Sequence, residues 1–95
     1  MKPLNFAILK FFCSGKEACR KDVQNALQAD YGKFRAFKDS QMDDALQTAC
    51  SNGLIEESRL ELDAENNLVI YYKANADGIA SINKYGEMLF IGDGI

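Results

Sequence analysis

The sequence has no histidine and no tryptophan, and it holds a single proline among 95 residues. Without histidine the chain lacks the commonest general base and the commonest metal ligand, and it cannot form a Ser-His or Cys-His nucleophile pair. The three cysteines are an odd number with no Cys-x-x-Cys pair, so neither a disulfide framework nor a zinc knuckle is indicated. We therefore predict no catalytic residue, no metal site and no cofactor, and we do not expect an enzyme.

The cysteines and the chain ends also bear on the compartment. Cys13 and Cys50 occupy apolar positions of helical patterns, which is typical of small core side chains, whereas Cys19 is the candidate for an exposed thiol. The N-terminal segment lacks the continuous apolar run of a signal peptide or membrane span. We therefore expect a complete small cytoplasmic protein with reduced thiols.

Length and composition indicate one globular domain. With 47% hydrophobic and 26% charged residues, the chain has enough apolar surface for one core and no room for a second. The net charge of -3 does not favour attraction of polyanions by the whole surface. Binding to nucleic acid would need a local basic patch.

Apolar residues recur every three or four positions in three segments of the first half of the chain, which predicts three amphipathic helices. The third begins at Ser40-x-x-Asp43, which fits a capping box, and closes at Asn52-Gly53. The stretch between the second and third segments, residues 32–38, breaks the period and is predicted to be a loop. The helices are expected at about residues 4–13, 19–31 and 40–52.

After the third helix the apolar residues recur every second position and no longer every 3.6 residues, which predicts strands. Leu60 and Leu62 alternate with Arg59 and Glu61, and a second run is rich in β-branched and aromatic residues. A polar turn cluster separates the two runs. The pattern predicts a β-hairpin over about residues 54–74.

A last helix is predicted over about residues 76–85, capped by Asn75 or Asp77 and ended by Gly86. Ile79, Ile82 and Tyr85 are expected on its inner side. A short apolar run follows, which either folds back on the core or contacts a second copy of the chain. We favour a homodimer contact through these residues, which are Met88, Leu89, Phe90 and Ile91.

The order of these elements resembles the winged helix-turn-helix DNA-binding superfamily. Ala45-Leu46-x-x-x-Cys50-x-x-Gly53-Leu54-Ile55-Glu56 is similar to the end of that family's third helix and the start of its first wing strand. Tyr71-Tyr72 followed by Ala76-Asp77-Gly78-Ile79 is similar to its strand end and the start of its last helix. The resemblance covers residues 4–86. It implies an α+β fold with three helices, a two-stranded β-hairpin wing and a C-terminal helix, in a single winged-helix domain over 1–95.

The resemblance also implies a transcriptional regulator whose partner is duplex DNA. Helix 40–52 would enter the major groove, and the start of helix 19–31 would meet phosphates. Within helix 40–52, Gln41 and Gln47 are suited to reading adenine, and the hydroxyls of Ser40 and Thr48 to contacting phosphate. The cations expected to face one stretch of DNA backbone are Lys16, Arg20, Lys21, Lys33, Arg35 and Lys38.

Charge is distributed unevenly along the chain. Residues 1–38 carry eight cations and three acids, net +5, whereas residues 39–95 carry three cations and eleven acids, net -8. An acidic wing does not favour phosphate contacts, which need cations to release counterions. An alternative function is therefore a winged-helix protein interaction module, in which the acidic third helix and wing bind a basic partner or the basic half of a second copy.

Two aromatic pairs leave a further alternative open. Phe34 with Phe37, and Tyr71 with Tyr72, could stack on the bases of single-stranded nucleic acid. We favour core packing for both pairs, because a chain of this size needs large apolar side chains to fill its core.

Overall fold

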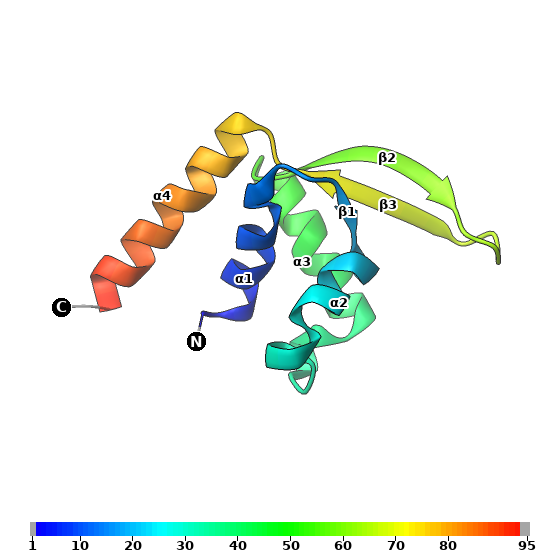
Figure 1. The fold of residues 1–95 in the computed structure, drawn as a ribbon, viewed down its shortest axis with the longest axis horizontal. Coiled ribbons are helices and arrows are strands. Elements are labelled where there is room, and N and C mark those ends of the chain that lie inside the picture. Colours follow the sequence, from blue (N-terminus) through cyan, green and yellow to red (C-terminus); the bar gives the residue numbers. More distant parts are fainter. Residues whose placement is uncertain (1, 94–95) are drawn as a thin grey trace.

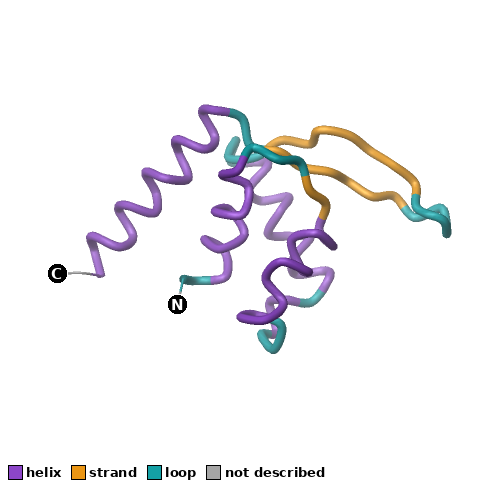
Figure 2. Tube along the Cα trace, in the orientation of Figure 1, coloured by secondary structure: helices purple, strands orange, loops and turns teal. Residues whose placement is uncertain are grey.

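The computed structural model describes residues 2–93, with side chains described as far as Gly86. Three helices lie side by side, a β-hairpin projects from one side of them, and a long last helix slants away on the other (Figure 1). Figure 2 shows the same division, with the strands confined to one flank of a helical body. The elements are α1 (Leu4–Phe11), η1 (Phe12–Ser14), β1 (Ala18–Cys19), α2 (Arg20–Tyr31), η2 (Arg35–Phe37), α3 (Asp39–Ser51), β2 (Glu56–Leu62), β3 (Leu68–Lys73) and α4 (Ala76–Asp93).

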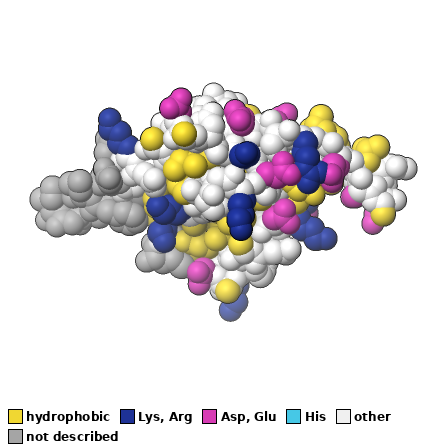
Figure 3. All heavy atoms as spheres, turned by 45° about the horizontal axis from the view of Figure 1, so that its top comes forward, with side chains coloured by type: hydrophobic (Ala, Val, Ile, Leu, Met, Phe, Trp, Pro, Cys, Tyr) yellow, Lys and Arg dark blue, Asp and Glu magenta, His cyan; other side chains and the backbone are white. Residues whose placement is uncertain are grey.

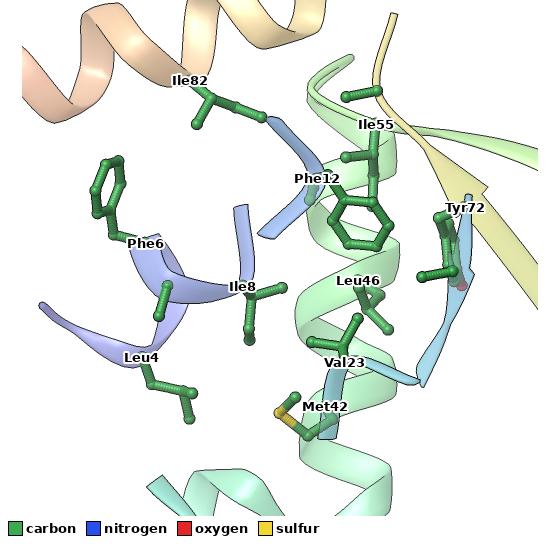
Figure 4. Close-up of a cluster of buried hydrophobic side chains, with 14 of the residues drawn as sticks. Leu4, Phe6, Ile8, Phe12, Val23, Met42, Leu46, Ile55, Tyr72 and Ile82 are labelled. Carbon is green, nitrogen blue, oxygen red and sulfur yellow. The ribbon is translucent and has the colours of Figure 1, made fainter. Parts of the chain in front are cut away.

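The core is built around α3. Met42 and Leu46, one turn apart on that helix, have no exposed surface. Phe12, Val23 and Ile82, from three other elements, are equally buried and belong to the same apolar cluster (Figure 4). The predicted helical stripes therefore converge on one apolar cluster. Truncating a side chain such as Leu46 to alanine removes about 2–5 kcal/mol of stability in cores of this kind.

The sheet has a strand that the period of the sequence did not predict. The two-residue strand β1 pairs antiparallel with β3, Ala18 opposite Tyr72 and Cys19 opposite Tyr71. The strand order is β1-β3-β2, so β2 is an edge strand. Two residues cannot show an alternating pattern, and only the long-range pairing reveals β1.

Cys19 is buried rather than exposed, with 8% of its surface accessible. It ends β1 and is the N-cap of α2, where its backbone N–H donates to Oδ2 of Asp22 at 3.2 Å. The expectation of an exposed thiol was therefore wrong, because strand pairing and capping both turn this residue inward. Cys13 and Cys50 are half-buried.

The capping box predicted at Ser40-x-x-Asp43 is also absent. The helix α3 begins one residue earlier, at Asp39, and its N-cap is Lys38, whose side chain makes no capping hydrogen bond. The side chain of Asp43 is used instead in a contact with α2. The other end agrees with the prediction, since Gly53 lies in the left-handed region at φ 77°.

The last helix does not stop at Gly86 but continues to Asp93. Asn75 caps it as predicted, accepting a hydrogen bond from the backbone N–H of Gly78 at 2.8 Å. A Cβ at Gly86 would lie 2.5 Å from Cζ of Phe6, so this glycine allows α1 to pack closely and does not end the helix. Residues 88–91 continue the α4 backbone, and the side chains of the predicted dimer contact lie outside the described part of the chain.

The aromatic side chains divide between core and surface. Phe37 and Tyr72 are buried as expected, and Tyr71 is half-buried. Phe34 is 44% exposed, so core packing was the wrong expectation for it. Tyr85 is 52% exposed although it was expected on the inner side of the last helix, and its ring still approaches that of Phe6 on α1, with centroids 6.2 Å apart.

Candidate nucleic-acid interface

The outer face of α3 carries the polar side chains predicted to read DNA. Ser40, Gln41, Gln47 and Thr48 are all exposed. They point to two sides of the helix: Gln41 and Thr48 line a hollow shared with α1 and α4, whereas Gln47 lines one shared with α2 and the hairpin. The structure therefore does not gather the two glutamines at one point.

Gln47 is held by the hairpin. Its Nε2 donates to the hydroxyl of Tyr72 at 2.5 Å, which leaves its side-chain oxygen for another partner. Burial raises the pKa of the Tyr72 hydroxyl, so this group stays protonated at neutral pH. The contact fixes the angle between α3 and β3 at the base of the hairpin.

The predicted phosphate-binding cation Arg20 is engaged by acids of α3. Its Nη1 lies 3.0 Å from Oδ2 of Asp43, and its Nη2 lies 3.5 Å from Oδ2 of Asp39. Its Nε is buried and has no hydrogen-bond partner among the described residues. One third of the side chain is exposed, so Arg20 is positioned by α3 and not fully available to a ligand.

A second polar contact joins α2 to the segment before α3. The Nε2 of Gln24 donates at 3.0 Å both to the carbonyl oxygen of Phe37 and to Oδ1 of Asp39. Phe37 is itself buried, with 6% of its surface accessible. These contacts hold residues 32–38, which we name the basic loop, against the body of the protein.

The basic loop displays three cations in fixed positions. Lys33, Arg35 and Lys38 are exposed, and none of them joins an ion pair among the described residues. Phe34, between the first two, packs edge-on against Tyr31 with ring centroids 5.4 Å apart. The loop therefore places three cations without ion-pair partners among the described residues beside the N-terminus of α3.

Lys16 and Lys21 are exposed as well, nearer the hairpin. A hollow of about 500 Å³ lies between α2, α3 and the hairpin, with Lys21 and Arg20 on one side and Leu68 and Ile70 on the other. Asp43 also lines this hollow, so its walls are of mixed charge and partly apolar. The six predicted cations thus fall into two groups, the basic loop at one end of α2 and the remainder at the other.

The hairpin has two cations, and one of them is paired. Lys73 at the end of β3 is exposed, whereas Arg59 has its Nε 2.5 Å from Oε1 of Glu17 and its Nη1 paired with Glu61. Its guanidinium also stacks over the ring of Tyr71 at 3.8 Å. Hydrogen bonds from Ser58 and Arg59 lower the pKa of the Glu17 carboxyl, which keeps this cluster ionised.

The other face of the hairpin is apolar and open to solvent. Leu60 lies opposite Ile70 and Leu62 opposite Leu68 in the ladder, so the four side chains share one face. Leu60, Leu62 and Leu68 are 58%, 65% and 60% exposed. Figure 3 shows hydrophobic and acidic side chains together along the hairpin, at the right of the view.

Asp63 organises the tip of the hairpin. Its Oδ1 accepts hydrogen bonds from the backbone N–H groups of Glu65 at 2.8 Å and Asn67 at 2.9 Å. These bonds, that of Asn67 foremost, lower the pKa of the Asp63 carboxyl. Asn66 takes a left-handed backbone conformation at φ 63°, which closes the turn.

Comparison with known proteins gives one informative match. No protein-family model and no curated protein matches the chain. The crystal structure of Bacillus subtilis PadR in complex with operator DNA is similar to it, with a TM-score of 0.67 and 22% sequence identity over 86% of this chain. The chain has the winged helix-turn-helix fold. In this fold α3 takes the place of the recognition helix, and the hairpin of β2 and β3 is the wing.

The likeness is limited to one part of the neighbour, since the chain spans 45% of its length. It confirms the predicted α+β winged-helix architecture. Searches of the described residues find no helix long and apolar enough to cross a membrane and no cluster of three potential metal ligands. The ion pairs of Arg20 were missed from the sequence, where nothing local distinguishes this cation from its neighbour Lys21.

Proposed function

We propose that this protein binds duplex DNA as a transcriptional regulator, through α3 and the basic loop. The observation that carries the proposal is the set of three exposed, uncompensated cations, Lys33, Arg35 and Lys38, on a loop held rigid beside the N-terminus of α3. The solved structure with the same fold is a complex with operator DNA, which supports the proposal. The positive end of the α3 dipole adds to the attraction of phosphate at this point.

The roles within the proposed interface follow from exposure and hydrogen-bonding capacity. The cations of the basic loop and Lys21 would contact phosphates, and the hydroxyls of Ser40 and Thr48 would add neutral phosphate contacts. Gln47 would read a base edge through the oxygen that its bond to Tyr72 leaves free, and Gln41, on another side of α3, would have to read a separate base. Arg20 would join only on leaving Asp39 and Asp43.

We further propose that the protein acts in the cytoplasm as a homodimer joined through the end of α4, where the apolar run 88–91 lies. A dimer would present two copies of α3, so the DNA site would have two half-sites related by the same two-fold axis.

The test is a titration of a fluorescently labelled mixed-sequence duplex, followed by anisotropy at roughly 50 and 200 mM salt. The wild-type protein is expected to bind at low salt and to lose affinity steeply as salt rises. The variant K33A/R35A/K38A is expected to bind at least about tenfold more weakly and to lower the salt slope by roughly three.

The matched control is K10A/K73A/K84A, which makes the same charge change at exposed lysines outside the proposed interface. It is expected to retain most of the affinity, and circular dichroism of both variants checks the fold. Equal losses in the two triple variants would show attraction by net charge alone and would refute the assigned contact surface.

A second candidate function is a protein interaction module, favoured by the hairpin. Its cation Arg59 is already paired and its other face is apolar, which suits a protein partner better than a phosphate backbone. Absence of duplex binding even at the lower salt concentration would leave this candidate in place.

A further inference from the structure

The exposed apolar face of the hairpin is a candidate binding surface. We name the side chains of Leu60, Leu62, Leu68 and Ile70 the leucine face. A run of leucines that are each more than half exposed on a projecting hairpin is unusual for a surface that contacts only water. Two of these side chains, Leu60 and Leu62, belong to the edge strand β2, whose outer side has no paired strand among the described residues.

Charge around the leucine face limits what can bind there. Residues 56–67 hold five acids and one cation, and this cation is paired with Glu17 and Glu61. Two hairpins would repel one another, so contact between two leucine faces is disfavoured. Lys21 of α2 already lies across the hollow from Leu68, and an occupant that combines an apolar side chain with positive charge matches both the leucines and the acids.

The basic loop of this same chain has that chemistry. Phe34 is 44% exposed and stands between Lys33 and Arg35, both of which are exposed and unpaired among the described residues. Its ring is oriented by the edge-on contact with Tyr31, and Gln24 holds the end of the loop. The segment is therefore organised before it binds, which reduces the entropic cost of association.

The two surfaces cannot meet within one molecule. The hairpin leaves the body near the start of α2, whereas the basic loop follows the other end of that helix (Figure 1). A contact between them requires a second copy of the chain.

We propose that the leucine face of one copy binds the basic loop of another. Phe34 packs on the leucine face near Leu62 and Leu68, while Lys33 and Arg35 approach the acids at the tip of the hairpin, Asp63 and Glu65. This contact is different from the dimer contact proposed at the end of α4. It joins two dissimilar surfaces, so it extends from copy to copy or closes as a reciprocal pair.

The contact also has a consequence for DNA, which rests on the proposed function. The basic loop cannot bind phosphates and a neighbouring hairpin together, so self-association would compete with duplex binding. The test below contains no DNA, and its result is therefore independent of whether the protein binds a duplex.

The test is sedimentation velocity of the full chain at roughly 50 and 300 mM salt, over a range of protein concentrations. Two variants each remove one surface, Phe34→Ser in the loop and Leu62→Ser with Leu68→Ser in the hairpin. All three side chains are exposed, so the fold is expected to persist in both variants, as circular dichroism can verify. The wild-type protein is expected to be heavier than either variant at low salt and to approach their mass at high salt.

Mixing the two variants gives the decisive result. The loop variant keeps an intact hairpin and the hairpin variant keeps an intact loop, so an equimolar mixture is expected to form a complex heavier than either variant alone. A wild-type protein no heavier than the variants, or a mixture without association, would overturn the proposal.

Tyr85→Ser is the control for the loss of an exposed aromatic side chain outside the proposed contact. Tyr85 is 52% exposed on α4, and its replacement is expected to leave the salt-sensitive association unchanged. Association lost in this variant and retained in both of the others would place the contact on α4 and likewise overturn the proposal.

Discussion

Nη1 of Arg20 lies 3.0 Å from Oδ2 of Asp43, so the first residue of α2 is paired with the helix that takes the recognition position of the fold. Asp39 adds a second, longer contact at 3.5 Å. In the proposed DNA complex, this acid on α3 would compete with phosphate for the cation. The proposed interface contains its own competitor for phosphate at this position.

Replacing Asp43 with asparagine is expected to strengthen duplex binding. The substitution keeps the size of the side chain and removes the charge, so Arg20 retains only Asp39 as an acidic partner. We expect the affinity at low salt to rise severalfold and the salt slope to steepen by about one, measured by anisotropy. The unfolding free energy should change by no more than about 1 kcal/mol, because the pair is partly exposed to solvent.

Asp30→Asn is the matched control for this change, since Asp30 is an exposed acid on α2 that makes the same charge difference. If both variants tighten binding equally, the effect is one of net charge and the competition at Arg20 is refuted.

Charge reversal in the hairpin, with Glu61→Lys and Glu65→Lys, is expected to act on both proposed interactions. Duplex binding should tighten by about tenfold or more at low salt because two acids become cations near the phosphates. Self-association should weaken because Glu65, an acid at the tip of the hairpin, becomes a cation that repels the basic loop. Anisotropy and sedimentation velocity measure the two effects separately, and unchanged self-association would contradict the role given to the acids.

Gly86→Ala is expected to destabilise the protein. In an exposed helix the replacement of glycine by alanine usually raises stability by about 1 kcal/mol. Here, however, the new Cβ would lie 2.5 Å from Cζ of Phe6. Overpacking of this kind typically costs about 1–3 kcal/mol, so urea unfolding should show a net loss. The same substitution in a Phe6→Leu background should be neutral or stabilising, and a loss of equal size there would rule out the steric cause.

The tip of the hairpin is expected to loosen in acid. Hydrogen bonds from the backbone N–H groups of Asn67 and Glu65 lower the pKa of Asp63 in the folded protein. The contribution of this carboxylate to stability is therefore complete above its unfolded pKa of about 4, and it is lost as the pH falls through the lower folded pKa. The pKa of Glu17 is lowered as well, so its contribution to stability is also lost in acid. NMR shifts of the Glu65 and Asn67 amides should therefore titrate with a midpoint below 4, and a midpoint at or above the unfolded value would contradict the structure. In Asp63→Asn the acid-dependent shift should disappear.

The sequence and the structure agree where spacing is local. The apolar residues of α1, α2 and α3 recur at the helical period, and the hairpin shows the period of a strand, so these elements and their order were predicted correctly. Gly53 and Asn75 were also read correctly, because a helix end depends on residues within one turn of it.

The candidate interface was only partly predictable. Exposure of Gln47, Lys33, Arg35 and Lys38 follows from their position opposite the apolar stripes or in a loop, and the structure places all four on the surface. Their contact with DNA stays a prediction.

Helix periods, turn residues and the uneven charge are properties of neighbouring residues, and the sequence by itself determined them. Tertiary structure alone decided which groups find partners. Arg20 pairs with an acid 23 positions away, β1 exists because it pairs with β3, and Phe6 occupies the space that a side chain at Gly86 would take. The physical reason is that a local pattern fixes which way a side chain points, whereas its partner depends on where the fold brings distant segments together.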